Sequence, residues 1–200
     1  MTSESLWIRA AESYRDAGAP AEAARCFHNA GLFQDAIDIY RELGMHAELA
    51  AEYEAAGQFW IAAWTRVHHL GDAAAARALL ARGSPAGEVI RRGQDVAEVV
   101  PVLHSLVQAR CDLAEGGDGS GLPQLFRHVQ QVLSTWPPGI AAGSLGEWAV
   151  AVAETSGRAD QVALIHAAAV RRGLPRAAEQ WQEWAVSRLG TRLTLPAAPR

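Results

Sequence analysis

Small and apolar residues recur about every 13 positions along the first 83 residues of the chain. A glycine closes each period. An aromatic or large apolar residue stands four positions before that glycine, and a small residue, usually alanine, stands five positions after it. The closing glycines are Gly18, Gly31, Gly44, Gly57, Gly71 and Gly83, and the residues four positions before them are Tyr14, Phe27, Tyr40, Tyr53, Val67 and Leu79. We call each period a rung, and the residue four positions before its glycine the ladder residue.

A rung of this length has room for a helix of about ten residues and a turn of about three. Glycine suits the end of such a helix, because it enters the left-handed backbone region without steric cost. The small residue and the ladder residue that follows it are four apart, so they share one face of a helix. Because the turns are so short, consecutive helices must fold back on one another as antiparallel hairpins.

Residues near the turns indicate where the helices begin. Pro20 fits the first position of the second helix, and Asp72 is a suitable N-cap for the sixth. Ser3 or Ser5 is predicted to cap the first helix, which should span about residues 5–17. An acid also follows each of the next three turns, where the helix dipole favours negative charge: Glu22, Asp35 and Glu48.

The ladder is irregular between Gly57 and Gly71, where one extra residue is present. Trp60, Trp64 and His68 follow one another at spacings of four residues in this rung. Counted forward from Gly57, Trp64 falls at an outward position, and counted back from Gly71 it falls at an inward one. These residues therefore either pack in the core or form an aromatic anchor for a partner helix or peptide.

The run Tyr14-x3-Gly18-x4-Ala23-x3-Phe27 resembles the central part of a tetratricopeptide repeat. That family repeats about every 34 residues, whereas two rungs of this chain make about 26. The shorter unit is similar to the helical-hairpin solenoids of vesicle-coat and ciliary-transport scaffolds, which share the run Ala-x3-Tyr-x3-Gly. The resemblance covers roughly residues 6–83 and implies a right-handed α-solenoid that binds other proteins.

The rest of the chain is also helical in pattern. We expect a short helix at 86–92 and a longer one at 94–115, in which Pro101 shapes the first turn. The glycine-rich stretch 116–122 has the composition of a linker. The predicted divisions are an N-terminal repeat domain at 1–115, this linker, C-terminal helical hairpins at 123–190 and a tail at 191–200. Within the C-terminal part the predicted helices are 123–134, 144–156, 159–172 and 175–189.

Composition narrows the class of protein. Apolar residues make up 50% of the chain and charged residues 20%, and the net charge is −4. All 18 basic residues are arginine, which excludes Schiff-base lysines and the lysine of a phosphate-binding loop. Two cysteines are too few for a disulfide framework, and no membrane span or signal-peptide core is visible. We expect a bacterial, cytoplasmic protein that does not associate with membranes.

No candidate chemistry emerges from the motifs. The run from Gly116 to Gly121 lacks the preceding strand and following lysine of a phosphate site, so we interpret it as a linker. The histidines and cysteines lack the paired spacing of a zinc site. No serine stands in the strained turn that exposes a hydrolase nucleophile. We therefore expect no catalytic, cofactor-binding or metal-binding residues, and no enzymatic activity.

Charge is uneven along the chain. Residues 1–83 carry seven arginines and eleven acids, whereas residues 158–200 carry seven arginines and three acids. Arg171, Arg172 and Arg176 lie close together in the second segment. They form either a solvated basic face or a site for an acidic partner or nucleic acid.

Together these patterns predict an all-α protein, in which a right-handed solenoid of short antiparallel hairpins precedes a C-terminal helical bundle. The predicted function is that of a non-catalytic protein–protein interaction scaffold or adaptor. Two alternatives stay open: a regulator that binds nucleic acid through the arginine-rich C-terminal region, and a helical subunit of a bacterial multi-gene defence or ATPase system.

Overall fold

The computed structural model describes residues 2–83, 98–135 and 140–195. Every element in these ranges is a helix, so the fold is all-α as predicted, and none of the described helices is long and apolar enough to cross a membrane. The chain forms two compact units, residues 1–84 and 85–200. The helix predicted at 86–92 lies outside the described residues. The handedness of the predicted solenoid stays a prediction.

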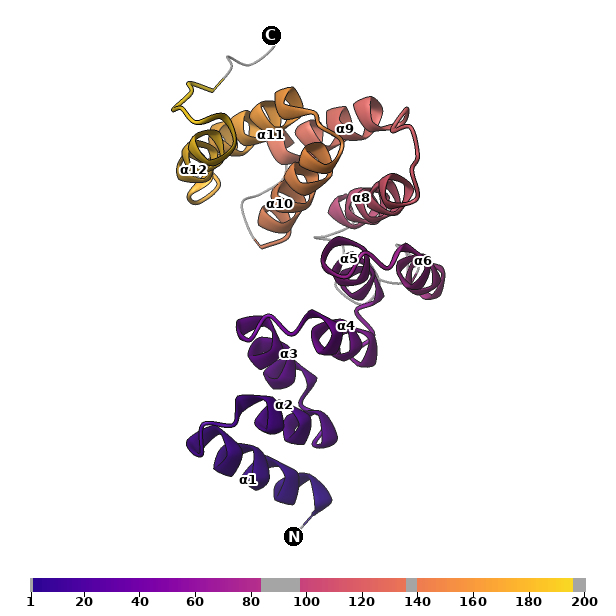
Figure 1. Ribbon diagram of the computed structural model, residues 1–200, viewed down its shortest axis with the longest axis vertical. Helices are drawn as coiled ribbons and strands as arrows, with labels where there is room; N and C mark the ends of the chain where they lie inside the picture. Colours follow the sequence, from indigo (N-terminus) through magenta and orange to yellow (C-terminus); the bar gives the residue numbers. More distant parts are fainter. Residues whose placement is uncertain (1, 84–97, 136–139, 196–200) are drawn as a thin grey trace. The chain divides into compact units, whose positions relative to one another are not determined.

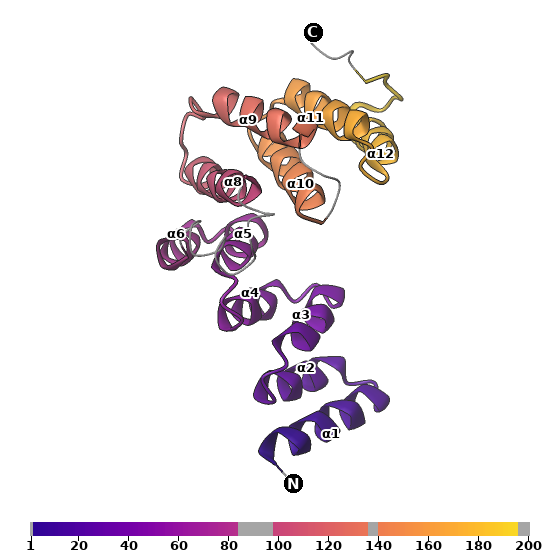
Figure 2. The same cartoon turned by 180° about the vertical axis from the view of Figure 1, so that it is seen from behind.

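The first unit consists of six short helices, one for each rung. Each packs against the next along the chain, so that the helices succeed one another as in a helical solenoid (Figures 1 and 2). The small residues of the repeat are fully buried between them, among them Ala23, Ala36 and Ala62. The helices are α1 (Ser3–Asp16), α2 (Pro20–Asn29), α3 (Phe33–Glu42), α4 (His46–Ala55), α5 (Phe59–His69) and α6 (Ala73–Arg82).

The turns explain why the ladder residue and the glycine are four apart. Gly18, Gly31, Gly44 and Gly57 all have φ near +70°, which places them in the left-handed region. In each of these turns the residue after the glycine donates its N–H to the carbonyl of the ladder residue, as Leu32 does to Phe27 at 2.9 Å. One residue therefore packs its side chain in the core and caps the helix end with its carbonyl.

Two of the predicted helix starts are confirmed and one is wrong. Pro20 begins α2, and the Asp72 side chain caps α6 by accepting the N–H of Ala75 at 2.9 Å. The cap of α1 is Thr2, whose side chain accepts the N–H of Ser5 at 3.3 Å, and not Ser3 or Ser5. The helix begins two residues earlier than predicted, which makes Thr2 the residue that can reach an unpaired N–H of the first turn.

The extra residue of the irregular rung is accommodated within α5, which has 11 residues, whereas α2, α3, α4 and α6 each have ten. The turn after it also differs, because Asp72 donates its N–H to the carbonyl of Arg66 and not to that of the ladder residue Val67. Trp64 is only 6% exposed. It therefore takes the inward position given by counting back from Gly71.

Within the described residues, the second unit contains five helices of 13 to 16 residues. They pack around large buried side chains such as Phe126, Leu103 and Ile165, and contacts join not only successive helices but also α8 with α10 and α9 with α11. The helices are α8 (Val99–Ala114), α9 (Leu122–Thr135), α10 (Ile140–Thr155), α11 (Ala159–Arg172) and α12 (Ala177–Leu189).

The two compact units divide at a different point from the glycine-rich stretch at 116–122. That stretch lies inside the second unit and joins α8 to α9. The sequence grouped α8 with the N-terminal repeats, but its buried residues, including Val102, Leu106 and Cys111, belong to a helix that packs on α9 and α10. The glycine content of this stretch is the composition of a turn between two helices. It does not mark the boundary between two hydrophobic cores.

Candidate interaction surfaces

The ladder residues are buried in every rung except the first. Phe27, Tyr40, Tyr53, Val67 and Leu79 are each at most 8% exposed. Tyr14 is 44% exposed, although it holds the same position in its rung. Because the helix of the preceding rung flanks each later ladder residue, Tyr14 marks the place where the stack lacks a neighbouring helix in the described structure.

Tyr14 belongs to a larger uncharged face of α1. Leu6 is 49% exposed and Trp7 is 39% exposed. At about 100° of turn per residue, these three side chains fall within one arc of roughly 100°. The other residues of that arc are small and uncharged: Ser3, Ala10 and Ala17. We call this surface the α1 face. Contiguous exposed apolar side chains on a helix are typical of interaction sites.

Polar ties between non-adjacent helices hold the stack in register behind this face. His28 of α2 places Nδ1 2.9 Å from both carboxylate oxygens of Glu52 on α4. Glu52 is buried, so its charge requires this partner. Glu54 of α4 forms an ion pair with Arg82 of α6, and the Arg82 guanidinium also lies over the Phe59 ring at 4.7 Å. These ties join α2 to α4 and α4 to α6.

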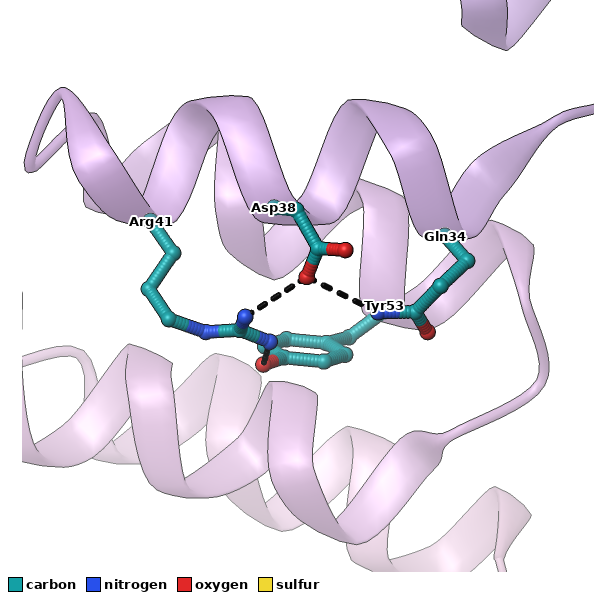
Figure 3. Close-up of polar contacts among 4 residues, drawn as sticks. All are labelled: Gln34, Asp38, Arg41 and Tyr53. Carbon is teal, nitrogen blue, oxygen red and sulfur yellow. Dashed lines mark hydrogen bonds and ion pairs between the residues drawn. The ribbon is translucent and has the colours of Figure 1, made fainter.

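A further polar group joins α3 to α4 (Figure 3). Arg41 donates one hydrogen bond to Asp38 at 2.7 Å and another to the hydroxyl of Tyr53 at 3.0 Å. Gln34 donates to the same carboxylate oxygen of Asp38 at 2.9 Å. The hydrogen bond to Tyr53 is the main cause that raises the pKa of Arg41. The ladder tyrosine thus satisfies its hydroxyl at the surface while its ring fills the core, which makes this group structural.

The aromatic stripe of the irregular rung is largely internal. Trp64 is buried and stacks on the His68 ring at 4.7 Å, while Trp60 and His68 are half-buried. A partner could contact Trp64 only if that side chain left its packed position. The structure does bring these residues beside two others that the spacing did not single out, His46 and His69.

Three imidazole rings gather where α4 begins and α5 ends. The His46 and His69 rings stack at 4.0 Å, and the His68 ring meets the His69 ring edge-on at 4.7 Å. Partial burial, and then the neighbouring His46 and His68, lower the pKa of His69 from 6.5 to about 4. Across the described residues, no group of three or more His, Cys, Asp or Glu side chains is placed to hold a metal ion. Because the rings are stacked and do not converge on one point, they are not arranged as metal ligands. The stack instead disfavours protonation of the rings.

The three arginines of the predicted basic face are spread over the end of α11 and the start of α12. Arg171 and Arg176 are exposed, and Arg172 is half-buried. Arg176 lies 3.2 Å from Glu179 and 3.5 Å from Glu183, so two acids of its own helix already offset its charge. The structure therefore presents a mixed surface here and not a purely basic one.

The glycine-rich stretch lines an open pocket of about 1010 Å³ between α8 and α9. Asp118 accepts the backbone N–H of Ser120 at 2.9 Å, and this hydrogen bond lowers the pKa of the Asp118 carboxyl. A carboxylate therefore lies just before α9, where a phosphate would need free N–H groups. This geometry favours the linker interpretation over an anion site.

A second apolar surface lies on α12 and the segment after it. Val186 and Leu189 are exposed neighbours on one helix face, and Leu193, in the segment after the helix, is also exposed. The Leu193 carbonyl accepts hydrogen bonds from Trp181 at 2.6 Å and Gln182 at 3.0 Å, which fixes the segment along the helix. We call this surface the α12 face. Trp181, by contrast, is buried in the core.

Comparison with protein-family models, curated proteins and solved structures finds no match for this chain. The class of the molecule therefore rests on its own architecture: an all-α chain whose first unit stacks six short helices, each on the next. Sequence reasoning did not find the α1 face. The signal was present, because Tyr14 is the only ladder residue with no earlier rung before it in the pattern.

Proposed function

We propose that this protein is a non-catalytic interaction scaffold of the tetratricopeptide-like, short-hairpin solenoid type, and that the α1 face is its docking surface. The exposed ladder residue Tyr14 is the observation that carries the proposal. In every later rung the same position is covered by a neighbouring helix. The repeat therefore supplies a template for what fits on the α1 face, namely another helix with small and apolar residues.

The electrostatics of the α1 face favour a partner of this kind. The exposed arc that holds Leu6, Trp7 and Tyr14 carries no charged residue. A helix that covered it would bury three large apolar side chains without desolvating an ion. Large aromatic side chains at the centre of an apolar patch commonly supply most of the binding free energy.

Capture with matched variants tests the proposal. The wild-type chain, Leu6→Glu and Leu43→Glu are each used to capture proteins from cells of the source organism. Leu43 is the control because it is similarly exposed but lies at the end of α3, away from the α1 face. We expect at least one polypeptide, this chain included, that is retained by the wild type and by Leu43→Glu but lost with Leu6→Glu. Retention of the same polypeptides by all three would overturn the proposal.

A further inference from the structure

The segment 191–195, which we call the strap, is held to α12 through one backbone carbonyl. The Leu193 carbonyl accepts hydrogen bonds from Nε1 of Trp181 at 2.6 Å and from Nε2 of Gln182 at 3.0 Å. Leu189 lies about 12 Å beyond Trp181 along the helix axis, and the four residues from Leu189 to Leu193 span at most about 14 Å. The strap therefore runs back along α12 in a largely extended form.

Few contacts hold the strap in place. Within the described residues, the two bonds to the Leu193 carbonyl are the only hydrogen bonds that join the strap to α12. Four of the five strap residues are exposed. A surface segment with so few contacts opens at a much lower free energy than the core does. Another chain can therefore compete with the strap for Trp181 and Gln182.

The side chain of Gln182 also has an acceptor that the strap does not use. Its Nε2 donates to Leu193, but its Oε1 is buried and has no hydrogen-bond partner in the described structure. A residue in an extended strand can direct its own N–H and C=O to the same side. One such residue could satisfy both atoms of the planar Gln182 amide. The strap supplies only a carbonyl, so it leaves a buried acceptor unpaired, which is unfavourable.

We propose that Trp181 and Gln182 form a docking site for an extended segment of a partner protein, and that the strap blocks this site until the partner displaces it. The partner segment supplies a carbonyl to both residues, as the strap does, and adds an N–H for Gln182 Oε1. Its main chain gives affinity, and alternate apolar side chains, as at Leu193 and Leu195, lie against the α12 face.

The occupant comes from another protein and not from a second copy of this chain. The strap of a second copy carries the same residues, so it would be an equal ligand and not a better one. The site belongs to the second unit and shares no residue with the α1 face. It is therefore an addition to the proposed function and stands or falls separately.

NMR of the indole N–H groups of the whole chain tests the proposal, with the Trp181 signal assigned by its loss in Trp181→Phe. The probe is the peptide acetyl-Arg-Leu-Thr-Leu-Arg-amide, which repeats the leucine spacing of the strap. Leu193→Asp should release the strap, because it places a charge where an apolar side chain packs. The Trp181 N–H should then exchange with water about tenfold faster or more, and the peptide should bind about tenfold more tightly than to the wild type.

Two controls separate the docking site from other effects of the variants. In the Leu193→Asp chain, Gln182→Met should weaken peptide binding about tenfold, because it removes the donor and the acceptor at similar side-chain size. Gln180→Met should leave binding unchanged, since Gln180 is also half-buried on α12 but has no described bond to the strap. Far-ultraviolet circular dichroism should be the same for all variants.

The predicted N–H is tested with two further peptides, each N-methylated at one of the two leucines. At least one of them should bind about tenfold more weakly than the parent peptide. If both bind as well as the parent, Gln182 Oε1 accepts no N–H and the proposed site is wrong.

Other results would also overturn the proposal. These are equal exchange of the Trp181 N–H in the wild type and Leu193→Asp, equal or undetectable peptide binding by the two chains, and binding that Gln182→Met leaves intact. Sedimentation velocity tests the source of the occupant, and the wild type should show no strap-dependent self-association. Self-association that Leu193→Asp abolishes would identify a second copy as the occupant and reject the partner protein.

Discussion

Tyr14 and Phe27 hold equivalent positions in consecutive rungs, yet Tyr14 is 44% exposed and Phe27 is 6% exposed. The backbone carbonyl of each residue accepts the N–H of the residue five positions later, at 2.9 Å in both cases. The two residues therefore differ in whether a neighbouring helix covers the side chain and not in local backbone structure.

This difference predicts unequal costs for the same kind of truncation. Phe27→Ala should lower the free energy of unfolding by about 3–5 kcal/mol, because it removes a buried ring and leaves a cavity. Tyr14→Ala should lower it by less than about 1 kcal/mol, since much of that ring already contacts water. Urea denaturation followed by circular dichroism measures both values. Similar losses for the two variants would show that a helix covers Tyr14 in solution.

The buried Glu52 should contribute to stability through His28. Glu52→Ala removes the partner of the His28 imidazole and is expected to cost about 1–2 kcal/mol. This cost is small for the loss of a buried ion's partner, because the His28 side chain is 45% exposed and can turn to water. Glu12→Ala, an exposed acid on α1, is the control and should change the free energy of unfolding by no more than about 0.5 kcal/mol. If the two substitutions had equal effects, the contact between His28 of α2 and Glu52 of α4 would not contribute to stability.

Glycine-to-alanine substitution should have opposite signs at two positions. Gly44 has φ of +66°, so Gly44→Ala forces a strained backbone and should cost about 1 kcal/mol. Gly146 lies inside α10 without positive φ and with open space where a Cβ would stand. Gly146→Ala should therefore stabilise the protein by about 0.5–1 kcal/mol. Thermal unfolding of both variants, compared with the wild type, gives the two signs directly.

The histidine stack predicts a loss of stability in acid. The pKa of His69 is lowered from 6.5 to about 4, so the unfolded chain takes up a proton more readily than the folded one. Its contribution to stability is complete above about pH 6.5 and falls as the pH decreases toward 4. Because His69 is only partly buried and much of it still contacts water, solvent screening limits the effect to the order of 1 kcal/mol. The wild type should thus lose more stability than His69→Gln between about pH 7 and pH 5. Equal losses, or a His69 midpoint near 6.5 by NMR, would contradict this.

The sequence predicted the helices well because their signals are local. Gly18, Gly31 and Gly44 end helices because their backbones adopt positive φ. Pro20 occupies the first position of α2, and the Asp72 side chain caps the start of α6. Such features require no knowledge of distant contacts. The first cap is Thr2, one residue before Ser3 and three before Ser5, so this error is also local.

Contacts between rungs were harder to predict, because they depend on which helix faces meet. The pairing of His28 with Glu52, which lie 24 residues apart, can be deduced only once the helices are stacked. The same holds for the position of His46 beside His69. The packing of α8 with α10 has the same origin, because apolar periodicity shows that a face is buried but not against what. The α1 face could have been inferred from the repeat itself, by asking which ladder residue has no earlier rung.

Site-specific photo-crosslinking in living cells tests the central claim, that the α1 face is a docking surface, most directly. A photo-reactive amino acid replaces Leu6 in one strain and Leu43 in another, since both side chains are similarly exposed. The account predicts covalent adducts with a polypeptide from position 6 and none from position 43. No adduct at position 6, or the same adducts from both positions, would contradict it.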